Sequence, residues 1–171
     1  TMGNPKTDWC YRAQPDAGLN GRAIPWPRGR VLGGSSSING LLYVRGQAQD
    51  YDHWRQLGNA GWGWDDVLPL FKKSESWMGE HINDARGTDG PLKVSPTRLS
   101  REIVDKWVEA AVSAGYKRNP DYNAGDQEGV GYFQLTSHKG QRCSSAKAYL
   151  KPARGRENLT VFTHTQVEKL K

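Results

Sequence analysis

The sequence of 171 residues predicts a mixed α/β (α+β) fold. Two observations predict this class: apolar residues recur at helical spacing in several segments, and short apolar or alternating runs lie between those segments. A third observation narrows it. Helices and strands do not follow one another in a regular βαβ series, and no internal repeat is present, so the expected order of elements is mixed.

The first 27 residues are expected to be largely irregular. Residues 8–14 alternate partly and favour a short strand, and the glycines around Asn20 predict a turn. Residues 24–27 are expected to be extended because two prolines restrict the backbone there. The following run, residues 35–44, predicts a short buried helix or a helix-to-strand transition.

Three segments predict longer helices. Aromatic and leucine side chains are spaced along one face of residues 50–57, and residues 65–74 carry a second apolar face. The clearest helix spans 101–114, where six apolar residues form one stripe. Ser100 is the expected N-cap of this helix and Gly115 its expected C-terminal stop.

Two loop-rich regions, 78–98 and 119–128, separate the remaining elements. The first contains several glycines and prolines and a short expected strand at 92–94. The second leads to an expected strand at 130–135.

The C-terminal part predicts one short helix and one extended element. Ser144 or Ser145 is expected to cap a helix that ends at Leu150, because Pro152 is expected to bar its extension. Residues 159–170 alternate between apolar and polar side chains and predict a strand or hairpin.

Composition limits the function classes. The formal net charge is +6, but lysines and arginines are scattered along the chain and no nucleic-acid-binding motif is present. Attraction of an anionic cofactor, or balance of acidic regions elsewhere in a longer protein, explains the charge more simply, so nucleic-acid binding is not expected. The four histidines lack metal-binding spacing and have no cysteine partners, so no metal site is expected. His53 is expected to be structural.

The location expected for the protein follows from its cysteines and its lack of apolar runs. Cys10 and Cys143 form no CxxC motif, and both are expected to be buried or partly buried free thiols in a reducing compartment. No apolar run approaches 20 residues and the N-terminus lacks the pattern of a secretory signal. A cytoplasmic location is expected, with membrane association of the full-length protein as the alternative.

Residues 28–52 carry the strongest functional signal. Gly33 and Gly34 are followed by three serines and an apolar run, a pattern that lets backbone N–H groups approach an anionic ligand. A phosphate-binding P-loop is excluded because Ser35 stands where its lysine is required. A nucleophile elbow is excluded at Ile38, and no complete GxGxxG is present. A tight loop capped by serines is the alternative to a ligand site.

This segment resembles the first signature of the glucose–methanol–choline (GMC) oxidoreductases, flavoproteins that oxidise alcohols. The matching positions are Gly29, Arg30, Leu32, Gly33, Gly34, Ser35, Ser36, Ile38, Asn39, Tyr43, Gly46 and Asp52. The resemblance continues through residues 50–54, 61–69, 71–75, 87–91, 142–146, 148–150 and 158–161. In these segments the sequence is similar to bacterial choline and alcohol dehydrogenases, and the resemblance covers nearly the whole chain.

The resemblance implies FAD as the cofactor. It implies that two glycines pack against the pyrophosphate and ribityl region, that the next residues lie along the flavin, and that a late valine holds the adenine through its backbone. The expected cofactor-binding residues are Gly33, Gly34, Ser35, Asn39, Gly40, Leu41, Val44 and Val167. Some relatives attach FAD covalently through a histidine before the matched asparagine. Ile38 occupies that position here, so non-covalent binding is expected.

The resemblance also divides the chain. Residues 1–75 correspond to part of an FAD-binding domain, 76–155 to part of a substrate domain or its connection, and 156–171 to a strand that returns to the FAD-binding domain. The GxGxxG unit that opens the family and the downstream catalytic histidine have no counterpart, so no catalytic residue is assigned. The chain is expected to be an internal fragment, inactive alone and a weak FAD binder.

The expected function is oxidation of a primary, choline-like alcohol by hydride transfer to flavin in the full-length enzyme. The expected partners are a small-molecule alcohol and an electron acceptor, either a quinone or dioxygen; the oligomeric state is not assigned. The alternative is a non-catalytic binding or interaction module, with a basic nucleic-acid-binding domain less favoured.

Overall fold

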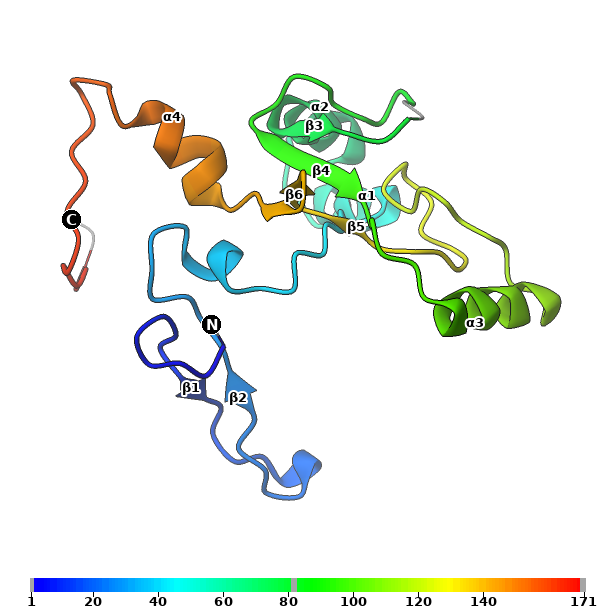
Figure 1. Cartoon of the computed structure of the whole chain (residues 1–171), viewed down its shortest axis with the longest axis horizontal. Helices are drawn as coiled ribbons and strands as arrows, with labels where there is room; N and C mark the ends of the chain where they lie inside the picture. Colours follow the sequence, from blue (N-terminus) through cyan, green and yellow to red (C-terminus); the bar gives the residue numbers. More distant parts are fainter. Residues whose placement is uncertain (1, 81–82, 170–171) are drawn as a thin grey trace.

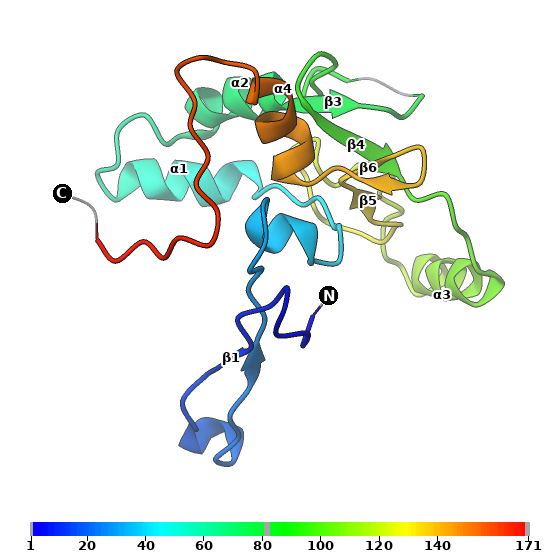
Figure 2. The same cartoon turned by 60° about the vertical axis from the view of Figure 1, so that its left-hand side comes forward.

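The computed structural model describes residues 2–80 and 83–169. An N-terminal arm, a central body of helices and small sheets, and an extended C-terminal segment make up the chain (Figure 1). The arm projects from the body in both views (Figures 1 and 2). None of the helices in this described part is long and apolar enough to cross a membrane.

The N-terminal arm is a narrow antiparallel ribbon. Strand β1 (Tyr11–Arg12) pairs with β2 (Pro25–Trp26), which confirms strand structure within both predicted extended segments. The 3₁₀ helix η1 (Ala17–Leu19) lies at its tip, where the Asp16 carboxylate accepts a hydrogen bond of 2.7 Å from the N–H of Gly18. The predicted turn is therefore present and begins with an aspartate cap.

Buried Asp8 anchors the base of this arm. Its carboxylate accepts backbone hydrogen bonds from Gly3, Cys10 and Arg28 at 2.8–3.0 Å. These bonds favour the charged form, so they lower the pKa of Asp8 below its ordinary value. Cys10 is exposed, which corrects the expectation of a buried or partly buried thiol; it lies in the turn held by Asp8, with a φ of 54°. Cys143 is buried as expected.

Helices α1 (Ala48–Gln56) and α2 (Trp64–Ser74) confirm two predicted helices within a few residues. They pack through an aromatic cluster in which the ring of Tyr51 lies 5.8 Å from that of Trp64 and 5.7 Å from that of Phe71. Aromatic pairs at this separation stabilise a packed interface.

A three-stranded sheet follows α2. Strand β3 (Glu75–Trp77) pairs in parallel with β4 (Leu92–Pro96), and β4 pairs antiparallel with β5 (Gln134–Leu135). The strands expected at 92–94 and 130–135 are thus confirmed, the second only at its C-terminal end. Strand β3 was not predicted and crosses the expected boundary after residue 75.

A small hairpin follows the sheet. Strands β6 (Ser137–His138) and β7 (Gln141–Arg142) are joined by Lys139 and Gly140, both with positive φ. Two-residue turns of this conformation match the twist of paired strands. The sequence pattern predicts no element here.

Helix α3 (Glu102–Ser113) confirms the clearest prediction and stands at the edge of the molecule in both views (Figures 1 and 2). Its N-cap is Arg101 and not Ser100, and no side chain caps it. Gly115 follows its last turn with a φ of 98°, as a C-terminal stop requires.

The C-terminal part departs from the prediction. A π-helical turn η3 (Ala146–Leu150) continues directly into α4 (Lys151–Ala153), so Pro152 does not end the helix. It lies in the first turn of α4, where proline's missing N–H is tolerated. Residues 159–169 form no strand, which corrects that prediction; residue 170 lies outside the described residues. These residues pair with no strand in the described chain, and their side chains are nearly all exposed.

Candidate functional site

The predicted cofactor loop folds back on itself at two glycines. Gly33 has a φ of 88° and precedes the 3₁₀ helix η2 (Gly34–Ser37). A Cβ on Gly33 would lie 2.5 Å from Oγ of Ser37 and 3.1 Å from Cβ of Ala146. Packing within the chain therefore requires glycine at this position, whereas the family resemblance implies that the cofactor requires it.

Gly34 and Gly40 behave differently from Gly33. A Cβ built on either residue would meet no atom of the described chain within 4 Å. Gly34 has a φ of 54°, while Gly40 has no conformational need for glycine. Both leave open space beside the backbone, as a ligand that approaches closely would need. The loop therefore fits one wall of a site for a large cofactor such as FAD.

Two residues distant in sequence clamp this loop. Ser145 donates through Oγ to the carbonyl oxygen of Gly33 at 3.1 Å, and through its N–H to Oγ of Ser36 at 2.9 Å. The Arg142 guanidinium donates to Oδ1 of Asn39 at 2.6 Å and to its carbonyl oxygen at 2.7 Å. Neither residue was assigned a site role, because nothing local in the sequence reveals a partner more than 100 residues away.

The segment after the loop, residues 41–45, alternates its side chains between the interior and solvent. Tyr43 and Arg45 point into the protein, while Leu42 and Val44 are 49% and 52% exposed. The backbone pairs with β5, where Leu42 bridges Leu135. Two adjacent apolar side chains are thus presented outward by a firmly held backbone, a surface suited to an aromatic ring system.

A buried cluster of charges lies beneath this segment. Glu75 is fully buried and accepts from Arg45 and, at 2.7 Å, from Arg86. Arg86 also pairs with Asp121 and donates to Oε1 of Gln134 at 2.5 Å. Two arginines and two carboxylates therefore neutralise one another inside the fold.

Asp121 carries the one resolved acidic pKa shift of this cluster among the described residues. Burial raises its pKa, but hydrogen bonds from Arg86, Gln134 and Asn83 outweigh burial, so the net shift lowers the pKa below its ordinary value. The carboxylate is consequently held charged in the folded protein.

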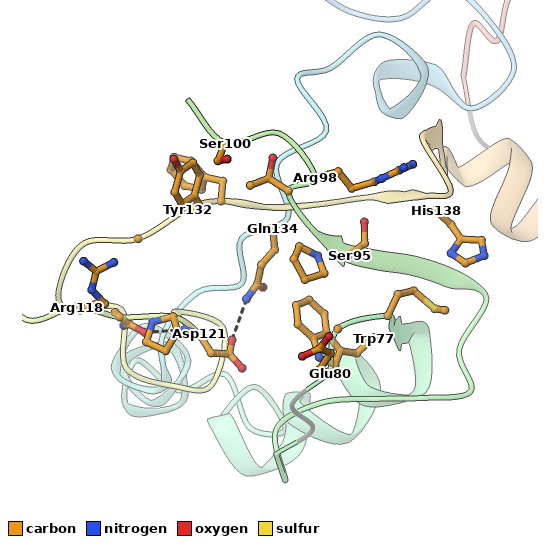
Figure 3. A pocket seen from close by; sticks show the side chains of 18 of the residues that line it. Trp77, Glu80, Ser95, Arg98, Ser100, Arg118, Asp121, Tyr132, Gln134 and His138 are labelled. Carbon is orange, nitrogen blue, oxygen red and sulfur yellow. Dashed lines mark hydrogen bonds between the residues drawn. The ribbon is translucent and has the colours of Figure 1, made fainter. Parts of the chain in front are cut away.

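A cavity borders this cluster at Asp121 and Gln134 (Figure 3). It measures about 1150 Å³, and its walls include Trp77, Tyr132, Asp121 and Gln134. Figure 3 shows the hydrogen bond that joins the last two side chains. None of the predicted cofactor-binding residues lines this cavity. Val44 lines a smaller one of about 210 Å³.

Seven of the eight predicted residues lie in one continuous stretch of the sequence, residues 33–44. Val167 is separate. It is 68% exposed and belongs to the C-terminal segment, which runs apart from the loop at the left of Figure 1. His53 is exposed on α1, and the described chain holds no group of three side chains suited to a metal.

Comparison with known proteins decides the family. The sequence pattern of the GMC oxidoreductase family matches residues 9–171. This chain belongs to the GMC oxidoreductase family. Membership confirms the resemblance, and the mixed α/β arrangement agrees with the FAD-binding domain expected for this family.

Two bacterial relatives illustrate the relationship of this GMC chain to whole enzymes. It is 47% identical over 161 residues to an oxygen-dependent choline dehydrogenase of Sinorhizobium fredii, covering 94% of the chain and 29% of the relative. It is also 47% identical over 152 residues to an oxygen-dependent choline dehydrogenase of Brucella anthropi, covering 89% of the chain and 28% of that relative. The chain thus spans under a third of the length of these relatives.

Solved structures support the same assignment. The GMC chain superimposes on pyridoxine 4-oxidase from Mesorbium loti with a TM-score of 0.87 and 37% identity, over 95% of this chain and 32% of that one. An FAD-dependent oxidoreductase from Chaetomium thermophilum superimposes with a TM-score of 0.77 and 28% identity, over 90% of this chain and 31% of that one. These similarities support FAD as the cofactor.

Proposed function

We propose that this chain is one part of a longer, FAD-dependent enzyme that oxidises a primary alcohol such as choline. The single observation that carries the proposal is the segment from Gly29 to Asp52, which combines the family signature with two open glycine faces. The names of the bacterial relatives support a choline-like substrate.

Bound FAD would supply the hydride acceptor for oxidation of the alcohol to an aldehyde. The residues of this chain supply one wall of its site. Gly34 and Gly40 leave room for the cofactor, Leu42 and Val44 exclude water from it, and Asn39 offers a polar side chain held by Arg142. The group that removes the alcohol proton is proposed to lie outside this chain.

Three further features belong to the proposal. FAD is held without a covalent bond, since Ile38 offers no nucleophile. Dioxygen is the electron acceptor, which the description of the relatives as oxygen-dependent supports, so each turnover reduces dioxygen to hydrogen peroxide. The enzyme acts in the cytoplasm, and cell fractionation with an antibody tests this.

Reduction of the bound flavin by alcohols tests the function. The full-length protein is purified with FAD and mixed without oxygen with choline, ethanol or benzyl alcohol, and the yellow flavin absorbance is followed. Bleaching by choline or another primary alcohol is expected, and hydrogen peroxide is expected after air is admitted. An oxidised flavin that no primary alcohol reduces would overturn the proposed reaction.

A further inference from the structure

The backbone of residues 43–45 is held by side chains and not only by strand pairing. The carbonyl oxygen of Tyr43 accepts from the Tyr122 hydroxyl at 2.8 Å and from Nδ2 of Asn123 at 3.0 Å. The N–H of Arg45 donates to Oδ1 of Asn123 at 2.7 Å. The two peptide groups that flank Val44 are therefore both fixed by two adjacent residues of one loop.

These two residues are themselves held on the buried side. The hydroxyl of Tyr122 accepts from the N–H of Gln134 at 2.8 Å, and Nδ2 of Asn123 also donates to Oε1 of Gln134 at 2.6 Å. Asn123 is 1% exposed and Gln134 is 3% exposed. Since Arg86 donates to the same Oε1, the loop rests on the buried charge cluster described above.

Val44 and Tyr122 also line one small cavity together with Phe133. The rings of Tyr122 and Phe133 meet edge to face, with centroids 5.7 Å apart. Val44 is therefore located by hydrogen bonds to the backbone on either side of it and by an aromatic pair at the same cavity.

We propose that Tyr122 and Asn123 are positioning residues of the flavin site: they fix the Tyr43–Arg45 backbone so that Val44 stands at a constant position behind the flavin. The inference rests on the proposed function for the presence of FAD. Its physical basis is that buried, fully bonded polar side chains rigidify the segment that they hold. A displaced apolar side chain would admit water and change the polarity around the flavin.

The test compares two tyrosine hydroxyls in the FAD-loaded full-length protein. Tyr122→Phe removes the hydroxyl that bonds Tyr43. Tyr132→Phe is the matched control, because its part-buried hydroxyl donates to Asp105 at 2.6 Å, away from residues 43–45. The midpoint potential, visible flavin spectrum, kcat and KM are measured for each, together with the unfolding midpoint.

Tyr122→Phe is expected to shift the flavin potential and spectrum and to lower kcat about 2- to 10-fold with little change in KM, the range that one net hydrogen bond allows. Both variants are expected to lower the unfolding midpoint by similar amounts, but Tyr132→Phe is expected to leave the flavin potential, the spectrum and kcat unchanged. Asn123→Asp, which keeps the acceptor for Arg45 but removes both donors, is expected to shift the potential further.

Equal potentials, spectra and kcat for the two phenylalanine variants would overturn the inference. The potentials are measured with a chemical reductant and do not depend on alcohol oxidation. If no alcohol reduces the flavin, the proposed reaction is refuted, but the comparison of Tyr122→Phe with Tyr132→Phe still tests the positioning role. A full-length protein without flavin would overturn both.

Discussion

Glu75→Gln tests whether the buried charge cluster stabilises the fold. Glu75 is fully buried and faces the guanidinium groups of Arg45 and Arg86, whose side chains are 1% and 0% exposed. Its carboxylate also accepts from the N–H of Gly87 at 3.2 Å. The amide keeps the shape but leaves two buried positive charges facing a neutral group, so the loss resembles that of breaking a buried ion pair.

Removal of one partner from such a pair costs about 3–5 kcal/mol, and we expect about 3 kcal/mol because glutamine retains an acceptor. For a chain of this size that corresponds to a fall in melting temperature of about 6–12 °C. Glu109→Gln is the control. Glu109 pairs with Lys106 on the surface of α3, where the side chains are 55% and 65% exposed, and its loss should cost about 0–0.5 kcal/mol.

Thermal and urea unfolding of both variants, beside the unmodified protein at the same chain length, measures these differences. A free-energy loss below about 1 kcal/mol for Glu75→Gln would refute the reasoning, because it would mean that the arginines find water or other partners when the carboxylate is removed.

Three further outcomes are expected. Gly33→Ala should destabilise the protein by about 1–3 kcal/mol, since the added methyl meets Ser37 and the residue has a positive φ. The control is the unfolding midpoint of Gly155→Ala, where the added methyl meets no atom within 4 Å. Arg142→Lys should weaken FAD binding about 10-fold in a titration, because the single nitrogen of lysine does not reproduce the two-nitrogen fork that holds both oxygens of Asn39; unchanged affinity would contradict the clamp. The pKa of Asp121 is lowered in the folded protein, so its carboxylate stabilises the fold only while it is charged. The free energy of unfolding should therefore fall as the pH drops below about 4. Asp121→Asn should make this loss of stability at acid pH smaller.

The helices could be predicted because their signals are local. Residues 48–56, 64–74 and 102–113 each show apolar side chains at helical spacing, and the pattern survives in the fold even though α3 buries only Val108. Local periodicity identifies a helix irrespective of what finally covers it.

Strand β3 could not be predicted because its signal is not local. Glu75 and Ser76 are polar, and polar residues indicate exposed loops. They become buried here because Glu75 meets arginines 30 and 11 positions away in sequence. Such long-range pairing leaves no periodic pattern in the sequence.

The C-terminal segment is the reverse case, because the sequence predicts a strand there that the described residues do not form. Alternation at residues 159–170 predicts a strand, but a strand also requires a partner for its backbone groups. No partner lies among the described residues, so the segment stays extended and Val167 is not brought to the loop at residues 33–44.

The cofactor loop was predictable as a unit, and its support was not. Glycines and serines close together in sequence indicate a loop that admits a ligand, which the open faces of Gly34 and Gly40 support. The clamps from Arg142 and Ser145 come from the other end of the chain. Only the folded structure shows that Gly33 serves this packing.

Gly40→Leu tests most directly the claim that this loop forms a wall of the FAD site. A side chain at Gly40 meets no atom of the chain within 4 Å and needs no positive φ, and the same holds for Gly155. Full-length protein with Gly40→Leu is expected to fold but to purify without flavin, while Gly155→Leu retains about one FAD per chain. A Gly40→Leu protein that keeps its full FAD content would contradict the account.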